Sequence, residues 1–260
     1  MLMHATPIDP GARARHFYVD ALRELDRAGA RYAVGGGYAL AYYTGIQRNT
    51  KDLDIFVKPE DHRQVLQVLS DAGYRTEYFY PFWIAKALSG PDFIDILYNS
   101  GNGQARVDDE WFTHGVRAEV LGYETLLIPP EELVWSKGFV MDRDRYDGAD
   151  IHHVFLSLGD RLDWDRLIRR FKGHERVLLA HAVLFGYAYP SERGQIPAAV
   201  LDRLLGHLGE AAPTAERVCF GSNLAHRSYL HPIHAWGYAD GRIKPHGPLA
   251  LEDVAQFPEH

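Results

Sequence analysis

Three aspartates and a run of three glycines are placed along the sequence so that they could act together in one reaction. Asp52 and Asp54 lie two positions apart in the alternating segment 52–57. Residues two apart on a strand project from the same face, about 6.5 Å apart along the chain, so the carboxylates would point together while Leu53 and Ile55 face the core. Two adjacent carboxylates repel each other, and a divalent cation relieves that repulsion. The pair therefore predicts a metal site rather than a solvated strand edge.

A third acid, Asp95, interrupts the otherwise apolar segment 93–97. An acid within an apolar strand needs a partner, because a buried charge is costly when it is left alone. If this strand lies beside the strand of Asp52 and Asp54, three carboxylates converge. Such a set suits two Mg²⁺ ions, about 3.5–4 Å apart, that hold the attacking and leaving oxygens of a phosphoryl transfer. The simpler alternative is that Asp95 only accepts hydrogen bonds.

The glycines Gly35, Gly36 and Gly37 stand between a predicted short strand, 31–34, and a predicted helix, 38–43. Without side chains, their backbone N–H groups and the helix N-terminus could approach a triphosphate closely. The turn is not a P-loop, because no Gly-Lys-Ser/Thr follows, and it is not the dinucleotide fingerprint G-x-G-x-x-G. The alternative is a tight turn with no ligand.

Around these residues, the periodicity of apolar positions predicts an α/β part followed by a mostly helical part. In the first part we expect helices over 11–28, 38–43 and 59–72, and strands over 31–34, 52–57, 74–80, 83–88, 93–98 and 116–121. After Pro129-Pro130 we expect helices over 131–140, 147–158, 164–171, 175–185 and 198–208. Segment 212–260 has no clear period. The predicted domains are therefore residues 1–129 and residues 130–260, with the helical part closing one side of a cleft.

Composition and charge exclude several classes of protein. The 260 residues are enough for one large domain or two modest ones. The net charge of −7 argues against broad binding to a nucleic-acid backbone. No run approaches the roughly 18 apolar residues of a membrane span, and no export signal begins the sequence, so we expect no membrane partner. With one cysteine, Cys219, no internal disulfide can form. We therefore expect a cytoplasmic protein.

Two blocks of sequence resemble the nucleotidyltransferase superfamily with the polymerase-β-like fold. The first combines Val34-Gly-Gly-Gly-Tyr-Ala-Leu40 with Gly45-x-x-Arg-x-Thr-x-Asp-x-Asp-Ile55 and the later lone strand acid Asp95. The second, Pro129-Pro-Glu-Glu-Leu133 to Lys137 followed by Arg145-x-Asp-x-x-Asp-Ile151, is similar to small bacterial nucleotidyltransferases. That group includes abortive-infection type toxins. The resemblance covers residues from about 31 to 151.

The resemblance implies a polymerase-β-like core with a mixed sheet and an enzyme that moves an NMP from an NTP to an acceptor hydroxyl, releasing pyrophosphate. It implies that the glycine turn binds the nucleotide phosphates, that Asp52 and Asp54 hold Mg²⁺, and that Asp95 helps to activate the hydroxyl. It places further residues in the nucleotide site, namely Arg48, Thr50, Lys137 and Asp150. The acceptor could be RNA, a protein or a small molecule, and the toxin relatives add a protein antitoxin as a candidate partner.

Simpler interpretations stay open for several of these residues. Lys137 could be a surface lysine whose stem covers the apolar side of its helix. Asp147 and Asp150, one helical turn apart, could only cap or solvate the helix start. Arg48 could salt-bridge an acid and stabilise the turn. For the whole chain, the alternative function is a nucleotide-binding or toxin-like interaction protein that keeps the fold without turnover.

The histidines of the C-terminal segment raise a separate metal hypothesis. Cys219, His226, His231 and His234 form a C-x6-H-x4-H-x2-H series. Structural zinc sites prefer tighter paired spacings, so ordinary loop histidines are the favoured interpretation.

Overall fold

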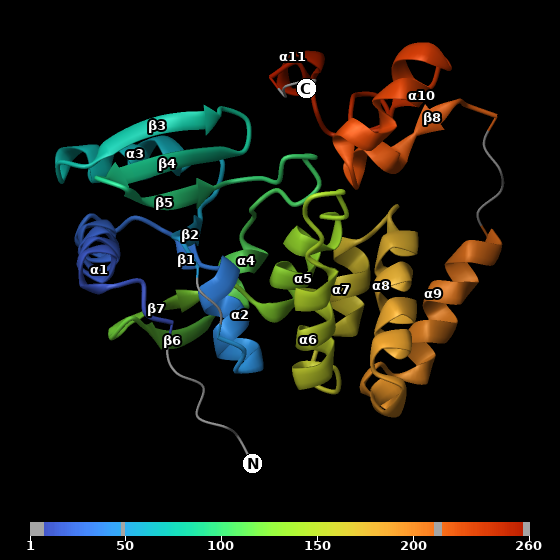
Figure 1. The fold of residues 1–260 in the computed structure, drawn as a ribbon, viewed down its shortest axis with the longest axis horizontal. Coiled ribbons are helices and arrows are strands. Elements are labelled where there is room, and N and C mark those ends of the chain that lie inside the picture. The colour runs from blue at the N-terminus through green and yellow to red at the C-terminus, as the bar shows by residue number, and fades with distance from the viewer. Residues whose placement is uncertain (1–7, 48–49, 211–214, 257–260) are drawn as a thin grey trace. The chain divides into compact units, whose positions relative to one another are not determined.

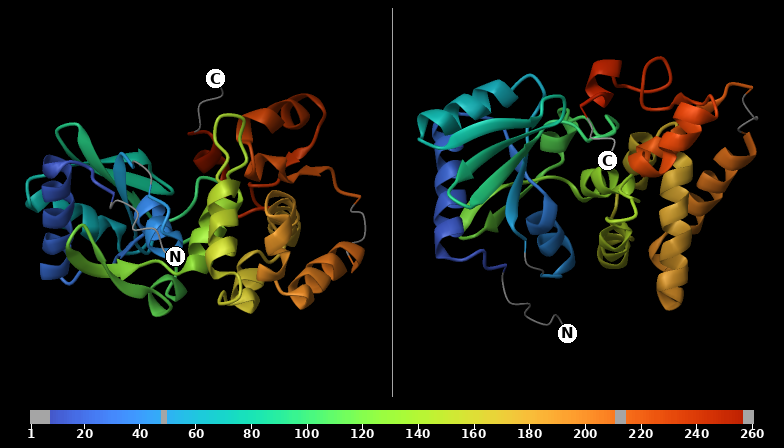
Figure 2. Two further views of the ribbon diagram at one scale, coloured as in Figure 1. Left: turned by 60° about the horizontal axis from the view of Figure 1, so that its bottom comes forward. Right: turned by 45° about the horizontal axis from the view of Figure 1, so that its top comes forward.

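The computed structural model describes residues 8–47, 50–210 and 215–256 (Figures 1 and 2). Arg48 therefore lies outside the described residues. The backbone divides into two compact units. The first comprises Met1–Gly101 and Ala105–Pro129, and the second comprises Asn102–Gln104 and Pro130–His260. Within the described part of the chain, no helix is both long and apolar enough to cross a membrane.

The first unit is built on a seven-stranded mixed sheet, which confirms the expected α/β class (Figure 1). Its strands are β1 (Ala33–Val34), β2 (Asp52–Phe56), β3 (Arg75–Tyr80), β4 (Ile84–Ser89), β5 (Asp92–Leu97), β6 (Val116–Val120) and β7 (Tyr123–Leu127), in the order β3-β4-β5-β2-β1-β7-β6. Strands β2 and β5 pair in parallel, as do β1 and β7, and the other neighbours are antiparallel. The helices of this unit are α1 (Ala12–Arg27), α2 (Gly36–Thr44), α3 (His62–Asp71) and α4 (Glu110–Thr113).

The main core of this unit lies between one face of the sheet and the helices α1 and α3, which contact each other. Both helices carry apolar residues at helical spacing, and these residues pack on the alternate strand positions Leu53, Ile55, Ile94 and Ile96, which are all fully buried. Because side chains alternate across a strand, the intervening residues of β2 and β5 project from the opposite face. Those intervening positions include the three aspartates.

Strand β7 and helix α4 were not among the elements expected from the sequence. Strand β7 follows β6 through a two-residue turn, in which Leu121 and Gly122 both have positive φ, at 54° and 79°. Two consecutive positive φ values are typical of a type I′ hairpin, whose twist matches that of the strands. Strand β7 then pairs with β1 at Val34, so it joins the hairpin to the strand that leads into the glycine turn.

The second unit is mostly helical, and the five helices expected in it are all present (Figure 1). They are α5 (Pro130–Gly138), α6 (Gly148–Leu158), α7 (Trp164–Arg170), α8 (Glu175–Ala188) and α9 (Ala198–Glu210), with a short 3-10 helix at Pro190–Gln195. Helix α5 contacts α6, α7 and α8. The rest of the unit is made of short pieces, β8 (Val218–Cys219), two 3-10 turns, α10 (Leu230–Ala235), β9 (Ala239–Asp240) and α11 (Leu251–Val254). Such short elements explain why the sequence of this segment shows no period.

Candidate active site

The three aspartates predicted to converge do so on one face of the first unit's sheet. Strands β2 and β5 are parallel neighbours, and Asp54 is in register with Asp95. One carboxylate oxygen from each of Asp52, Asp54 and Asp95 can be chosen so that all three lie within 4.8 Å of one another. Asp95 is 9% exposed. Parallel pairing therefore joins acids that are about forty residues apart in sequence into one group of oxygen ligands.

The glycine turn lies directly against this group. The N–H of Gly35 donates to the backbone oxygen of Asp54 at 2.9 Å, which joins the turn to β2. Helix α2 begins at Gly36, earlier than the sequence predicts, and Gly36 has a φ of +53°. A Cβ on Gly36 would lie 1.7 Å from Oδ2 of Asp54, so only glycine fits between the helix start and the carboxylate.

Thr50 and Gly37 lie beside the same group of carboxylates and glycines. The Thr50 hydroxyl donates to Oδ1 of Asp52 at 2.9 Å, and a Cβ on Gly37 would meet the Thr50 side chain at 3.2 Å. The start of α2 has no side-chain cap among the described residues, so its first N–H groups can serve an anion. Thr50 thus orients a carboxylate while the glycines bring backbone donors beside it.

Lys86 is a residue of this site that the sequence reasoning missed. Its Nζ contacts Oδ1 of Asp95 at 2.5 Å from the adjacent strand β4, where the two residues are in register. Lys86 is a lone lysine between Ala85 and Ala87, both fully buried. The same signal that singled out Asp95, a charge within an apolar strand, could have identified it.

Two tyrosines, Tyr18 and Tyr38, lie near the site without belonging to the triad. The Tyr18 hydroxyl donates to the backbone oxygen of Lys51 at 3.2 Å, just before β2. Burial, together with nearby negative charges that include Asp52 and Asp54, raises the pKa of both Tyr18 and Tyr38. Both phenols therefore stay protonated near neutral pH and keep their hydroxyls as hydrogen-bond donors.

The predicted residues Lys137 and Asp150 are brought together in the second unit. Lys137 Nζ lies 2.8 Å from a carboxylate oxygen of Asp150 and 2.8 Å from one of Asp147. The side chain of Lys137 is 12% exposed and that of Asp150 is 3% exposed. Burial acts to raise the pKa of Asp147, but hydrogen bonds from Arg145 and Lys137 outweigh it and lower that pKa. Lys137 is thus the centre of a buried ion cluster rather than a lysine extending over the surface.

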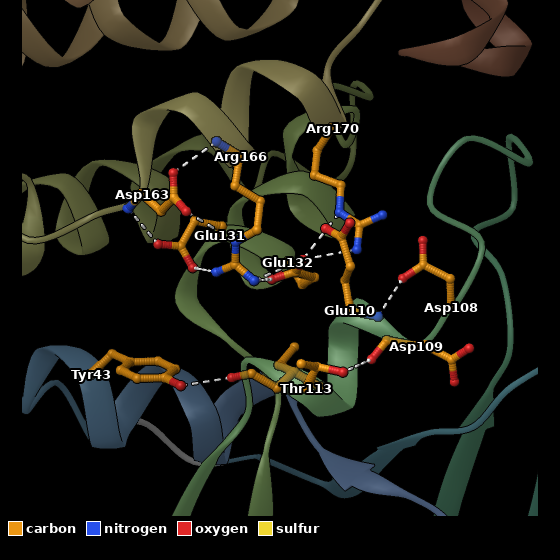
Figure 3. A network of polar contacts seen from close by, with 11 residues as sticks. Tyr43, Asp108, Asp109, Glu110, Thr113, Glu131, Glu132, Asp163, Arg166 and Arg170 are labelled. Carbon is orange, nitrogen blue, oxygen red and sulfur yellow. Dashed lines mark hydrogen bonds and ion pairs between the residues drawn. The ribbon is translucent and has the colours of Figure 1, made fainter.

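The two glutamates of the Pro-Glu-Glu motif, Glu131 and Glu132, bind the arginines of helix α7 (Figure 3). Arg166 contacts Glu131 and lies 3.3 Å from Glu132, while Arg170 lies 3.0 Å from Glu132. Glu132 is fully buried and Arg166 is 4% exposed. Burial raises the pKa of Glu132 to about 7 against the attraction of both arginines. This part of the motif therefore connects α5 to α7.

The C-terminal histidines do not form a metal site in the residues that the structure describes. There, the aspartate triad is the group of three or more ligating side chains close enough to hold an ion. Cys219 is a free thiol of intermediate exposure. Burial lowers the pKa of His226 to about 4, so this imidazole is neutral at physiological pH.

Sequence comparison agrees with this geometry. A family model described as an uncharacterised nucleotidyltransferase matches residues 13–189, which include the triad, the glycine turn and the Lys137 cluster. No curated protein matches the chain by sequence.

Comparison of the fold finds solved nucleotidyltransferases. The lincomycin-bound lincosamide antibiotic adenylyltransferase LnuA is 21% identical, with a TM-score of 0.39, over 57% of this chain and 98% of its own. ANT(2")-Ia in complex with adenylyl-2"-tobramycin is 15% identical, with a TM-score of 0.43, over 69% and 99%. An antigenic nucleotidyltransferase-like protein from Paracoccidioides brasiliensis is 17% identical, with a TM-score of 0.48, over 76% and 100%. Identities and TM-scores this low assign no function to this chain.

Proposed function

Since the chain belongs to the family of uncharacterised nucleotidyltransferases, we propose that it uses Mg²⁺ to transfer an NMP from an NTP to an acceptor hydroxyl, with release of pyrophosphate. The observation that carries this proposal is the triad of Asp52, Asp54 and Asp95 beside the start of helix α2. At this place, carboxylates that can bind a metal lie next to backbone N–H groups that have no side-chain cap. This arrangement suits a metal-bound triphosphate.

The donor set fits Mg²⁺. Three carboxylates supply hard oxygen ligands within a few ångströms of one another, and histidine or thiolate ligands are not part of the group. When bound, Mg²⁺ supplies Lewis acidity and charge neutralisation, and we expect two ions. Asp52 and Asp54 would hold the metal, with the carboxylate of Asp52 oriented by Thr50.

The remaining roles follow from what each group can donate or accept. Asp95 would bind the second ion and accept the proton of the acceptor hydroxyl, because it is the third carboxylate of the group. Backbone N–H groups at Gly35, Gly36 and Gly37 would bind phosphate oxygens. We further propose roles in nucleotide binding for Arg48, Thr50, Lys137 and Asp150. Catalysis would then come from positioning and charge neutralisation rather than from a covalent enzyme intermediate.

Label transfer from α-labelled NTPs tests the proposal. Each of the four NTPs is incubated with the full chain, Mg²⁺ and a cell extract that is then separated into RNA, protein and small-molecule fractions. We expect label in one fraction, together with pyrophosphate release, and no label when the metal is chelated. The labelled fraction names the class of acceptor.

Two outcomes would favour the alternatives. Metal-dependent NTP binding with no labelled fraction would indicate a nucleotide-binding protein without turnover. Absence of both NTP binding and label transfer, together with a stoichiometric protein partner that co-purifies from the native host, would favour a toxin-like interaction protein.

A further prediction concerns Gly36. Replacing Gly36 with alanine places a Cβ 1.7 Å from Oδ2 of Asp54, so the carboxylate must leave its position. We expect nucleotidyl transfer to fall by about 10²-fold or more, because ligand geometry in the triad would be lost. The positive φ adds a stability cost of about 1–2 kcal/mol. Rates of label transfer and denaturant unfolding measure the two effects.

Gly45→Ala is the matched control, because Gly45 ends the same helix at a φ of +71° and a Cβ there meets no atom within 4 Å. This variant should share the stability cost and keep its activity. Equal loss of activity in both variants would show that backbone strain, rather than contact with Asp54, explains the effect.

A further inference from the structure

Lys86 and Asp95 form a close ion pair at the edge of the carboxylate triad. Their side chains are 17% and 13% exposed, and Nζ lies 2.5 Å from Oδ1. The pair is cross-strand, since the two residues are directly opposite each other in β4 and β5. Asp95 is in turn opposite Asp54 in β2. The charged side chains therefore form one row across three neighbouring strands.

Two aromatic rings hold the ammonium group in place. Nζ lies 4.0 Å from the ring centroid of Phe93 and 5.2 Å from that of Phe79. Cation–π attraction at these distances limits where the flexible lysine side chain can lie. Few water molecules can screen a pair enclosed in this way, so its charge acts strongly on its neighbours. An ammonium with one carboxylate and two rings around it differs from an ordinary surface lysine.

The consequences for the triad follow from its charge and geometry. The contact with Lys86 engages one oxygen of Asp95, and this limits rotation of the carboxylate. The lysine also places a positive charge beside the position of a divalent ion, and like charges repel. Lys86 thus holds the carboxylate of Asp95 in one orientation and at the same time opposes the binding of a cation.

We propose that Lys86 is a positioning residue that orients Asp95 for catalysis and weakens metal binding at the triad. The proposal rests on the proposed function, because it takes the triad to be the metal site. Its distinguishing feature is that removing the lysine changes metal affinity and turnover in opposite directions. A residue that only packs the strand would not produce this pair of effects.

The test is Mn²⁺ binding, measured by electron paramagnetic resonance without nucleotide, to the full chain and to Lys86→Met. Mn²⁺ accepts the same oxygen ligands as Mg²⁺. Methionine keeps the length and apolar stem of lysine. We expect the dissociation constant for Mn²⁺ to fall about tenfold or more, because a nearby positive charge is removed. At saturating Mg²⁺ the rate of label transfer should fall by about 10-fold to 100-fold, because Asp95 is no longer oriented.

Two further variants support the test. Lys86→Arg keeps the charge and should retain wild-type Mn²⁺ affinity and recover most of the turnover. Glu77→Gln changes the exposed residue opposite Lys86 on β3 and should alter both quantities by less than about twofold. If Lys86→Met fails to fold by its melting curve, Lys86→Gln takes its place and the same opposite changes are expected.

The results separate this proposal from the proposed function. Unchanged or weaker Mn²⁺ binding in Lys86→Met, with label transfer intact in the wild type, would overturn only the role of Lys86. Tighter binding in Lys86→Met without transfer by the wild type would overturn the proposed reaction and leave the effect of Lys86 on the metal site. Absence of Mn²⁺ binding in both the wild type and Lys86→Met, together with no label transfer by the wild type, would overturn both.

Discussion

Replacing Asp54 with asparagine is expected to lower nucleotidyl transfer by about 10³-fold or more, because metal ions supply several kcal/mol of transition-state stabilisation. Asp54 belongs to the carboxylate triad and contacts the glycine turn through its backbone oxygen. Asparagine keeps the size of the side chain but removes the charge that a divalent cation needs. The measurement is the rate of label transfer at several Mg²⁺ concentrations.

The same substitution should leave the metal-free protein as stable as the wild type or more stable. Three clustered carboxylates repel one another, and removing one negative charge relieves part of that repulsion. Activity and stability would then change in opposite directions, which separates loss of function from loss of fold. Denaturant unfolding without metal measures the second quantity.

Asp71→Asn is the matched control for this prediction. Asp71 is an exposed acid at the end of helix α3, on the other face of the sheet from the triad. The variant should keep both activity and stability. Retained activity in Asp54→Asn would remove the triad from the mechanism, and equal loss in both variants would indicate a general effect of charge.

Replacing Glu132 with alanine is expected to lower the free energy of unfolding by about 3–5 kcal/mol, which is typical when one partner of a buried ion pair is removed. Glu132 is fully buried and contacts both Arg166 and Arg170. Alanine leaves Arg166 buried with Glu131 as its remaining close carboxylate partner and leaves a cavity between α5 and α7. Urea unfolding above pH 7 measures the loss.

Asp165→Ala provides the comparison on helix α7, which carries the arginine partners of Glu132. Asp165 pairs with Arg203 at 2.6 Å, but its side chain is 77% exposed. Exposed pairs contribute about 0–1 kcal/mol, so this variant should be nearly as stable as the wild type. A small effect in Glu132→Ala would show that the buried network does not hold α5 against α7.

The pH dependence gives a second check on Glu132. Its pKa is raised in the folded protein from 4.5 to about 7, so between these values the folded protein binds a proton that the unfolded chain has released. The contribution of Glu132 to stability therefore falls as the pH rises through this window. The unfolding free energy of the wild type minus that of Glu132→Gln should therefore fall as the pH rises from 4.5 to about 7.

Local residue patterns were sufficient to predict most elements and the three acids. The alternation in 52–57 and the acid within 93–97 predicted two strands and the direction of their charged side chains, because alternation is a local property of an extended backbone. The five helices after residue 130 were predicted by the spacing of apolar residues in the same way. Strand β7 was not predicted, although Gly122 marks the turn before it.

Partners that are distant in sequence could not be predicted from such patterns. Lys86 is a single cation in an apolar strand until the antiparallel pairing of β4 with β5 places it against Asp95. Likewise, Glu131 and Glu132 belong to a motif whose arginine partners lie more than thirty residues later on α7. Each contact depends on which strands or helices become neighbours.

The residue pattern is sufficient to predict two acids on one face of a strand, a third acid within another strand, and a glycine turn before them. The meeting of these acids depends on the folded chain, because parallel pairing of β2 with β5 puts Asp54 opposite Asp95. The need for glycine at position 36 likewise depends on the folded chain, since the carboxylate of Asp54 occupies the space that a Cβ would take. Side-chain direction follows from local backbone geometry, whereas the proximity of two side chains follows from how the whole chain buries its apolar faces.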